Sequence, residues 1–117
     1  MGKVTYFEIT ADDLDRSIQF YAEAFGWKFK DQPFVGGYKL AATGTGSGID
    51  GAIMKRDYSE QPVIPWIEVD DIDEAIQKVG AAGGKTIQEK HTIPGIGHVV
   101  YIVDTEGNQI GLQQPLK

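Results

Sequence analysis

The feature that most constrains the fold of this chain is an internal repeat. Residues 12–26, DDLDRSIQFYAEAFG, recur as residues 70–84, DDIDEAIQKVGAAGG, after an offset of 58 positions. Seven of the fifteen aligned positions are identical. Similarity of this kind between two parts of one chain indicates two copies of one supersecondary unit. The sequence therefore predicts two similar modules in tandem.

Each copy of the repeat predicts one amphipathic helix. Asp12 or Asp13 offers an N-cap for the first helix, and Gly26 offers its left-handed stop. The second helix is expected over residues 71–82. β-Branched, aromatic and alternating residues predict strands at 4–10, 27–29, 38–42 and 52–55 in the first half, and at 63–69, 85–89, 98–103 and 109–113 in the second, with residues 91–97 as a loop.

The order of these elements is βαβββ in each half, which predicts an α+β fold. One such module has a helix on one sheet face and nothing on the other, so it cannot close a core alone. We expect two tandem modules to form a curved eight-stranded mixed sheet with two outer helices and a concave cleft. The length fits a single domain, 1–117, made of a first module (1–55), a crossover link (56–62) and a second module (63–117).

The composition excludes several kinds of function. The chain has no cysteine, which rules out disulfides, thiolate metal sites and a cysteine nucleophile. Its formal net charge of −6 disfavours nucleic acid and anionic membranes as partners. No apolar run approaches the length of a membrane span. These features predict a soluble cytoplasmic protein that binds neither nucleic acid nor a membrane.

Several short motifs carry a resemblance to a known family. They are DLDRSIQFY (13–21), FGW (25–27), the turn DTEGN (104–108) and the terminal strand IGLQQP (110–115). Together they resemble the vicinal oxygen chelate superfamily, which includes glyoxalase I, extradiol dioxygenases and bleomycin-resistance proteins. The resemblance covers nearly the whole chain. It implies paired βαβββ modules, a small-molecule ligand in the cleft and, as family members often pair, a homodimer.

The same resemblance identifies where a metal ion would bind. Metal-using members place His or Glu side chains on strands one, four, five and eight, and three of these positions correspond to Tyr6, Ile64 and Gly111. The fourth strand, residues 52–55, holds neither His nor an acidic residue. Ile and Gly have no metal-binding side chain, and neutral Tyr is a poor ligand for Zn²⁺, Ni²⁺ or Mn²⁺. We therefore expect no conventional metal site and no cofactor.

A divalent metal remains an alternative if the ligands have moved to other residues. Glu8, Glu68, His91 and His98 are the candidates, and the two carboxylates together with His98 could form such a relocated site. Because side chains alternate along a strand, Glu8 shares the predicted cleft face with Tyr6, and Glu68 shares it with Trp66. The competing interpretation is that each carboxylate has an ordinary hydrogen-bonding partner or lies at the mouth of the cleft.

The candidate site residues each allow two interpretations. Glu8 is expected either to act as a general base or ligand acceptor, or to pair with a nearby Tyr, Lys or Arg. Tyr6 and Trp66 are expected to stack on a planar ligand or to pack in the core. His98 is either an acid or base or a surface residue. The predicted catalytic residues are Glu8 and His98, and the predicted ligand-binding residues are Tyr6, Glu8, Met54, Trp66 and Glu68.

Two functions follow from these observations. The first is a glyoxalase-like protein that lacks the usual metal ligands and binds a small, partly apolar molecule in the cleft. The alternative is a metal-dependent lyase, isomerase or dioxygenase of the same superfamily that uses a relocated site. The missing ligand side chains favour the first.

Overall fold

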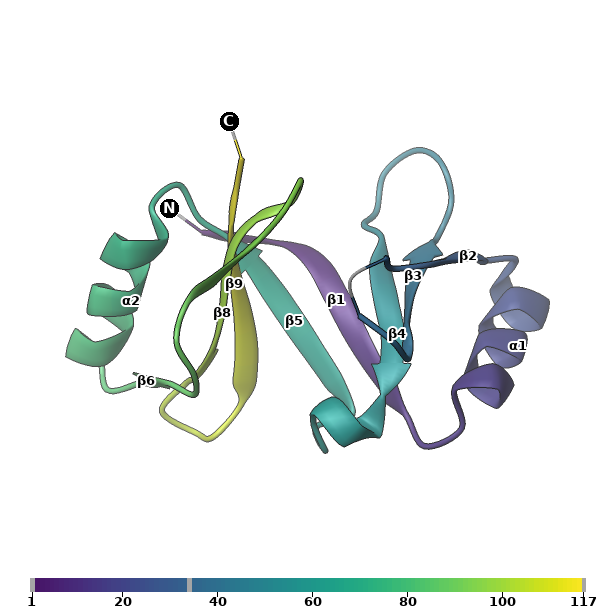
Figure 1. Ribbon diagram of the computed structural model, residues 1–117, viewed down its shortest axis with the longest axis horizontal. Coiled ribbons are helices and arrows are strands. Elements are labelled where there is room, and N and C mark those ends of the chain that lie inside the picture. The colour runs from purple at the N-terminus through teal and green to yellow at the C-terminus, as the bar shows by residue number, and fades with distance from the viewer. Residues whose placement is uncertain (1, 34, 117) are drawn as a thin grey trace. The chain divides into compact units, whose positions relative to one another are not determined.

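The computed structural model describes residues 2–33 and 35–116 (Figure 1). The chain divides into two compact units. We call Tyr6–Ile64 the N-terminal unit, and Met1–Thr5 together with Pro65–Lys117 the C-terminal unit. The first residues of strand β1 therefore belong to the C-terminal unit. The first two residues of strand β5 belong to the N-terminal unit.

The N-terminal unit contains the first predicted module. Its elements are β1 (Lys3–Ala11), α1 (Leu14–Phe25), β2 (Lys28–Asp31), β3 (Tyr38–Ala42), β4 (Gly51–Lys55) and a short 3₁₀ helix (Arg56–Tyr58). β2 pairs antiparallel with β3, β3 pairs antiparallel with β4, and β4 pairs parallel with β1. The helix begins after Asp13, whose carboxylate accepts a hydrogen bond from the backbone N–H of Arg16. It ends at Gly26, whose φ of 75° is the left-handed conformation that favours glycine.

The two faces of the N-terminal sheet have different neighbours. On one face, the Phe7 and Trp27 rings lie 5.7 Å apart, and Trp27 stacks on Tyr21 of α1 at 4.7 Å. This face therefore packs against the helix. Tyr6, Glu8 and Thr10 alternate onto the opposite face of β1. That opposite face positions the site described below.

The C-terminal unit contains the second module. Its elements are β5 (Val63–Glu68), α2 (Ile72–Ala81), β6 (Lys85–Thr86), β7 (His91–Ile93), β8 (Gly97–Val103) and β9 (Gln109–Pro115). β5 pairs parallel with β9, and β8 pairs antiparallel with β9, β6 and β7. The core of this unit consists of Ile72 of α2 with Val100, Ile102 and Leu112 of the sheet.

The predicted fold class and the order of both modules are confirmed, with one difference in the number of strands. The described residues contain nine strands rather than eight, because His91–Ile93 forms β7 where a loop was predicted. The turn at Pro94 and Gly95 explains the difference. Gly95 has a φ of 78°, and the N–H of Ile96 donates to the carbonyl of Ile93, so the chain folds back and pairs with β8. In addition, β6 ends at Thr86, earlier than the predicted strand 85–89.

Neither helix in the described part of the chain has the length and apolar character of a membrane span.

Candidate functional site

A hydrogen-bonded chain of three polar side chains, two of them half-buried and one buried, lies on the face of the N-terminal sheet that points away from α1. Glu8 is only 2% exposed. The hydroxyl of Tyr38 donates a hydrogen bond to Glu8 Oε2 at 2.5 Å, and Tyr38 Oη lies 2.9 Å from Tyr6 Oη. The chain therefore runs from Tyr6 through Tyr38 to the Glu8 carboxylate.

The register of the strands explains why these side chains meet. Glu8 of β1 lies opposite Ala52 of β4, and Ala52 also lies opposite Leu40 of β3. Because alanine carries only a methyl group, long side chains from β1 and β3 can meet above β4 at this position. Tyr38, two residues before Leu40, is on the same face as Leu40 and Glu8. Glu8 thus has the tyrosine partner that one of its two interpretations required.

The environment holds both phenols in their protonated form. Burial raises the pKa of Tyr6 to about 12, with a smaller contribution from the negative charge of Glu8. Burial also raises the pKa of Tyr38 far above its ordinary value, and the charge of Glu8 is the next largest cause. An ionised tyrosine would be poorly solvated here and would face a carboxylate. Each of the two hydroxyls therefore keeps one proton to donate.

This shift predicts a measurable dependence on pH. The pKa of Tyr6 is higher in the folded protein than the value of about 10 expected for the unfolded chain, so the folded state retains this proton more strongly. The stabilisation is present in full below about pH 10 and is lost as the pH rises towards 12. Phenolate absorbance should therefore show a group with a midpoint near 12 that disappears in Tyr6→Phe. If the group that Tyr6→Phe removes from the phenolate titration has its midpoint near pH 10, the ordinary value for tyrosine, this assignment is wrong.

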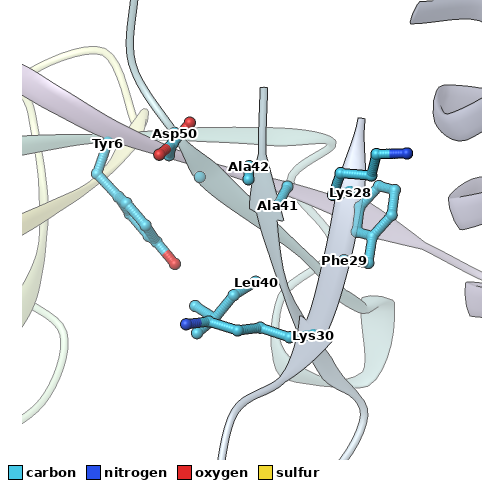
Figure 2. Close-up of a pocket in the computed structure, with 9 residues that line it drawn as sticks. Tyr6, Lys28, Phe29, Lys30, Leu40, Ala41, Ala42 and Asp50 are labelled. Carbon is cyan, nitrogen blue, oxygen red and sulfur yellow. The ribbon is translucent and has the colours of Figure 1, made fainter. Parts of the chain in front are cut away.

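A pocket of about 350 Å³ adjoins this chain within the N-terminal unit (Figure 2). Apolar lining comes from Leu40 and Phe29 together with the Tyr6 ring. The charged groups at the pocket include Lys30 and Asp50. Such a pocket suits a small molecule with an apolar body and few polar groups.

The polar groups at the pocket differ in how they are held. Asp50 Oδ1 accepts hydrogen bonds from the backbone N–H and the hydroxyl of Thr43, at 2.9 and 3.1 Å, so it connects the two ends of the loop between β3 and β4. Lys30 has no carboxylate at ion-pair distance among the described residues, whereas Lys39 is paired with Asp31. In Figure 2 the Lys30 side chain points towards the space beside Leu40.

Met54 is placed on the same sheet face as Glu8. It is 2% exposed and lies opposite both Thr10 and Tyr38 in the strand register. The hydroxyl of Thr10 is occupied by structural bonds, since it donates to the carbonyl of Gln61 and accepts from Nε of Arg56. Met54 is therefore buried in the sheet opposite Tyr38, and it is not among the residues that line the pocket.

Trp66 and Glu68 belong to the C-terminal unit, on the sheet face opposite α2. Trp66 is 7% exposed, and its ring lies edge-on to Tyr101 with centroids 5.1 Å apart. It lies opposite Gly111, where an added Cβ would overlap the indole atoms Cδ2, Cε2 and Cε3. Glu68 is half-buried and lies opposite Gln113. Trp66 thus occupies the space above Gly111.

His98 is on the other face of the C-terminal sheet. It has the same parity on β8 as Val100 and Ile102, which belong to the core against α2, and its Nδ1 lies 2.7 Å from the hydroxyl of Thr92. Tyr101, which contacts Trp66, has the opposite parity on β8. The structure therefore does not bring His98 and Glu68 together on one sheet face.

The sequence interpretation missed Tyr38 and Lys30. Tyr38 was assigned only to a strand, although a buried carboxylate at Glu8 requires a donor and a strand tyrosine is a suitable one. Within residues 2–33 and 35–116, no group of three or more His, Asp or Glu side chains is arranged to hold a metal ion.

Comparison with known proteins identifies relatives over nearly the whole chain. CFP32 of Mycobacterium tuberculosis, whose name carries a provisional glyoxylase assignment, is 28% identical over 97% of this chain. This chain spans only 46% of the length of CFP32. A Vibrio parahaemolyticus protein named as a probable lactoylglutathione lyase is also 28% identical, over 97% of this chain and 91% of the relative.

A solved structure and a family model agree with these relatives. Methylmalonyl-CoA epimerase from Mycobacterium tuberculosis shares the fold with a TM-score of 0.71 at 19% identity, covering 97% of this chain and 88% of the epimerase. Residues 3–112 match the family model described as the Glyoxalase/Bleomycin resistance protein/Dioxygenase superfamily. Because this family model matches most of its length, the chain belongs to the glyoxalase/bleomycin resistance protein/dioxygenase superfamily.

Proposed function

We propose that this protein binds a small, partly apolar molecule in the pocket of the N-terminal unit, without a metal ion. The observation that carries this proposal is the pocket of about 350 Å³ beside the hydrogen-bonded chain formed by Tyr6, Tyr38 and Glu8. Leu40 and Phe29 supply apolar surface, and Tyr6 supplies a polar atom that is held in position. Apolar walls with a few fixed polar groups are typical of small-molecule sites.

The residues at the expected metal positions do not fit a metal ion. Ile64 is completely buried and presents only hydrocarbon. Gly111 has no side chain, and the Trp66 indole occupies the space that a ligand side chain would need. Tyr6 is hydrogen-bonded to Tyr38, and a pKa of about 12 keeps its oxygen protonated, whereas metal ligation favours the anion. This mismatch of donor chemistry supports binding without the metal that many family members use.

Metal content tests this part of the proposal. We expect purified protein to contain far less than one equivalent of any transition metal by elemental mass spectrometry. Titration with Ni²⁺, Zn²⁺, Mn²⁺ or Fe²⁺ should leave the Tm unchanged, because only a ligand that binds the native state raises it. A chelator-treated sample provides the control. Near-stoichiometric metal together with a raised Tm would refute metal-free binding, and Glu8, Glu68 and His98 would then be the first residues to replace.

Small-molecule binding requires its own measurement. A thermal-shift screen of small carboxylic acids, alcohols and phenols should find compounds that raise the Tm. A ligand at about 100 times its Kd adds about 2.7 kcal/mol to the free energy of unfolding. Hits should be mapped by chemical shifts in the NMR spectrum, which we expect to change at Tyr6, Leu40 and Phe29. Shift changes confined to other parts of the chain would contradict the assignment of this pocket.

Other expectations remain predictions. Ligand contacts from Met54, Trp66 and Glu68 stay among these predictions. A catalytic role for Glu8 or His98, the single-domain organisation, the homodimer and the cytoplasmic location also remain predictions.

A further inference from the structure

The hydrogen-bond chain at the pocket has a definite direction. Each phenol has one O–H, and the proton of Tyr38 is used in the bond to Glu8 Oε2. The 2.9 Å contact between Tyr38 Oη and Tyr6 Oη therefore needs the proton of Tyr6. As a result Tyr6 donates to Tyr38, and its oxygen can offer only lone pairs to a molecule in the pocket. A ligand that meets Tyr6 must supply the hydrogen.

The surroundings of Tyr6 add a positive charge and an apolar wall. Figure 2 shows the hydroxyl end of Tyr6 and the Lys30 side chain pointing towards the space beside Leu40. Asp50 lies near the backbone end of Tyr6, away from Lys30 (Figure 2). An anionic group on the ligand would accordingly be attracted to the Lys30 end of the pocket and repelled from the Asp50 end.

We propose that the pocket selects small hydroxy-carboxylates, with the ligand hydroxyl donating to Tyr6 Oη, the carboxylate beside Lys30 and the hydrocarbon part against Leu40. This inference rests on the proposed function, since it names the ligand class of the same pocket. In this arrangement Glu8 does not touch the ligand. It is a positioning residue, because its carboxylate orients the Tyr38 proton and thereby makes Tyr6 an acceptor.

Three probe compounds separate these contributions. 4-Hydroxybenzoate carries both the donor and the carboxylate, 4-methoxybenzoate lacks the donor, and 4-methylphenol lacks the carboxylate. Affinities for the full chain should be measured by NMR titration at neutral pH. We expect 4-hydroxybenzoate to bind about tenfold more tightly than 4-methoxybenzoate, which is the effect of one well-placed hydrogen bond. It should also bind several-fold more tightly than 4-methylphenol, and salt should weaken only this second preference.

Single substitutions test which residue causes each binding preference among the three probes. Tyr6→Phe should abolish the preference for hydroxy over methoxy. Lys30→Met should abolish the preference for 4-hydroxybenzoate over 4-methylphenol, whereas Lys85→Met, which removes the same charge from the exposed strand β6, should not. Tyr38→Phe should remove most of the hydroxy preference, because the Tyr6 proton is then free to point into the pocket and donate to the oxygen of either probe. A merely structural role of Tyr38 would lower all three affinities without changing their ratios.

The outcomes distinguish this inference from the proposed function. Equal binding of the hydroxy and methoxy probes, or a preference that survives in Tyr6→Phe, overturns the acceptor role while leaving small-molecule binding intact. Failure of both benzoates to bind at millimolar concentration overturns the hydroxy-carboxylate class, and the thermal-shift screen then decides the broader proposal. If Tyr38→Phe does not fold, the Tyr6→Phe and Lys30→Met comparisons still decide the question.

Discussion

Gly111→Ala should lower the free energy of unfolding by about 2–3 kcal/mol, the size typical of overpacking a well-filled core. The Cβ of alanine would overlap three atoms of the Trp66 indole, and Trp66 is 7% exposed with its ring against Tyr101. The indole can move aside only by losing this packing. Urea denaturation followed by tryptophan fluorescence measures the change.

A matched glycine in the same unit provides the control. Gly80 lies in α2, and a Cβ added there meets no atom within 4 Å. Gly80→Ala should therefore stabilise the protein, by up to about 1 kcal/mol, through the better helix propensity of alanine. The cause can be tested further with Trp66→Leu, in which the cost of Gly111→Ala should fall markedly. An unchanged cost in that background would show that the indole is not the obstacle.

The same packing affects position 111, where the family resemblance would place a metal ligand. Glutamate at position 111 would require more space than alanine, so Gly111→Glu should destabilise the protein at least as much as Gly111→Ala. The residue that covers Gly111, Trp66, comes from the neighbouring parallel strand β5. The absence of a metal-binding side chain at Gly111 is therefore coupled to the packing of Trp66.

Ile72→Ala should lower the free energy of unfolding by about 3–4 kcal/mol, within the range measured for large-to-small changes in protein cores. Ile72 is 1% exposed and is the only residue of α2 that is fully buried in the described structure. It packs with Val100, Ile102 and Leu112. Truncation leaves a cavity at the contact between the helix and the sheet of the C-terminal unit.

The matched control is an exposed isoleucine. Ile87 is 52% exposed, so Ile87→Ala should change the free energy of unfolding by less than about 0.5 kcal/mol. Both variants can be compared in urea with the wild-type protein. A cost below about 1 kcal/mol for Ile72→Ala would mean that α2 does not depend on this contact, contrary to the packing described here.

Local sequence signals predicted much of the fold. The carboxylates of Asp13 and Asp71 cap the two helices by accepting backbone N–H groups three residues later. Gly26 ends the first helix in the left-handed conformation that was expected of it. These features depend on residues within a few positions of one another, so the sequence contains the necessary information. Strand β7 was missed because its pairing with β8 depends on the turn geometry at Gly95 as well as on residue type.

Reasoning from the sequence predicted only part of the candidate site. Alternation along one strand was enough to predict that Tyr6 and Glu8 share a face. The Tyr38 partner depends on the registers of β1, β3 and β4, which bring residues about thirty positions apart to within hydrogen-bond distance. His98 was a candidate because of its residue type, but the pairing of β8 with β9 puts it on the α2 side of its sheet, with Val100.

The sequence by itself determined the two tandem modules, each with one helix after its first strand, and the approximate helix boundaries. Those properties follow from local propensity, from the repeat and from side-chain chemistry. Only the tertiary structure decided that Tyr38 holds Glu8, that Trp66 covers Gly111 and that Lys30 lies at the pocket. These contacts depend on strand register and on the volume of neighbouring side chains, and both are set by interactions between segments that are distant in the chain.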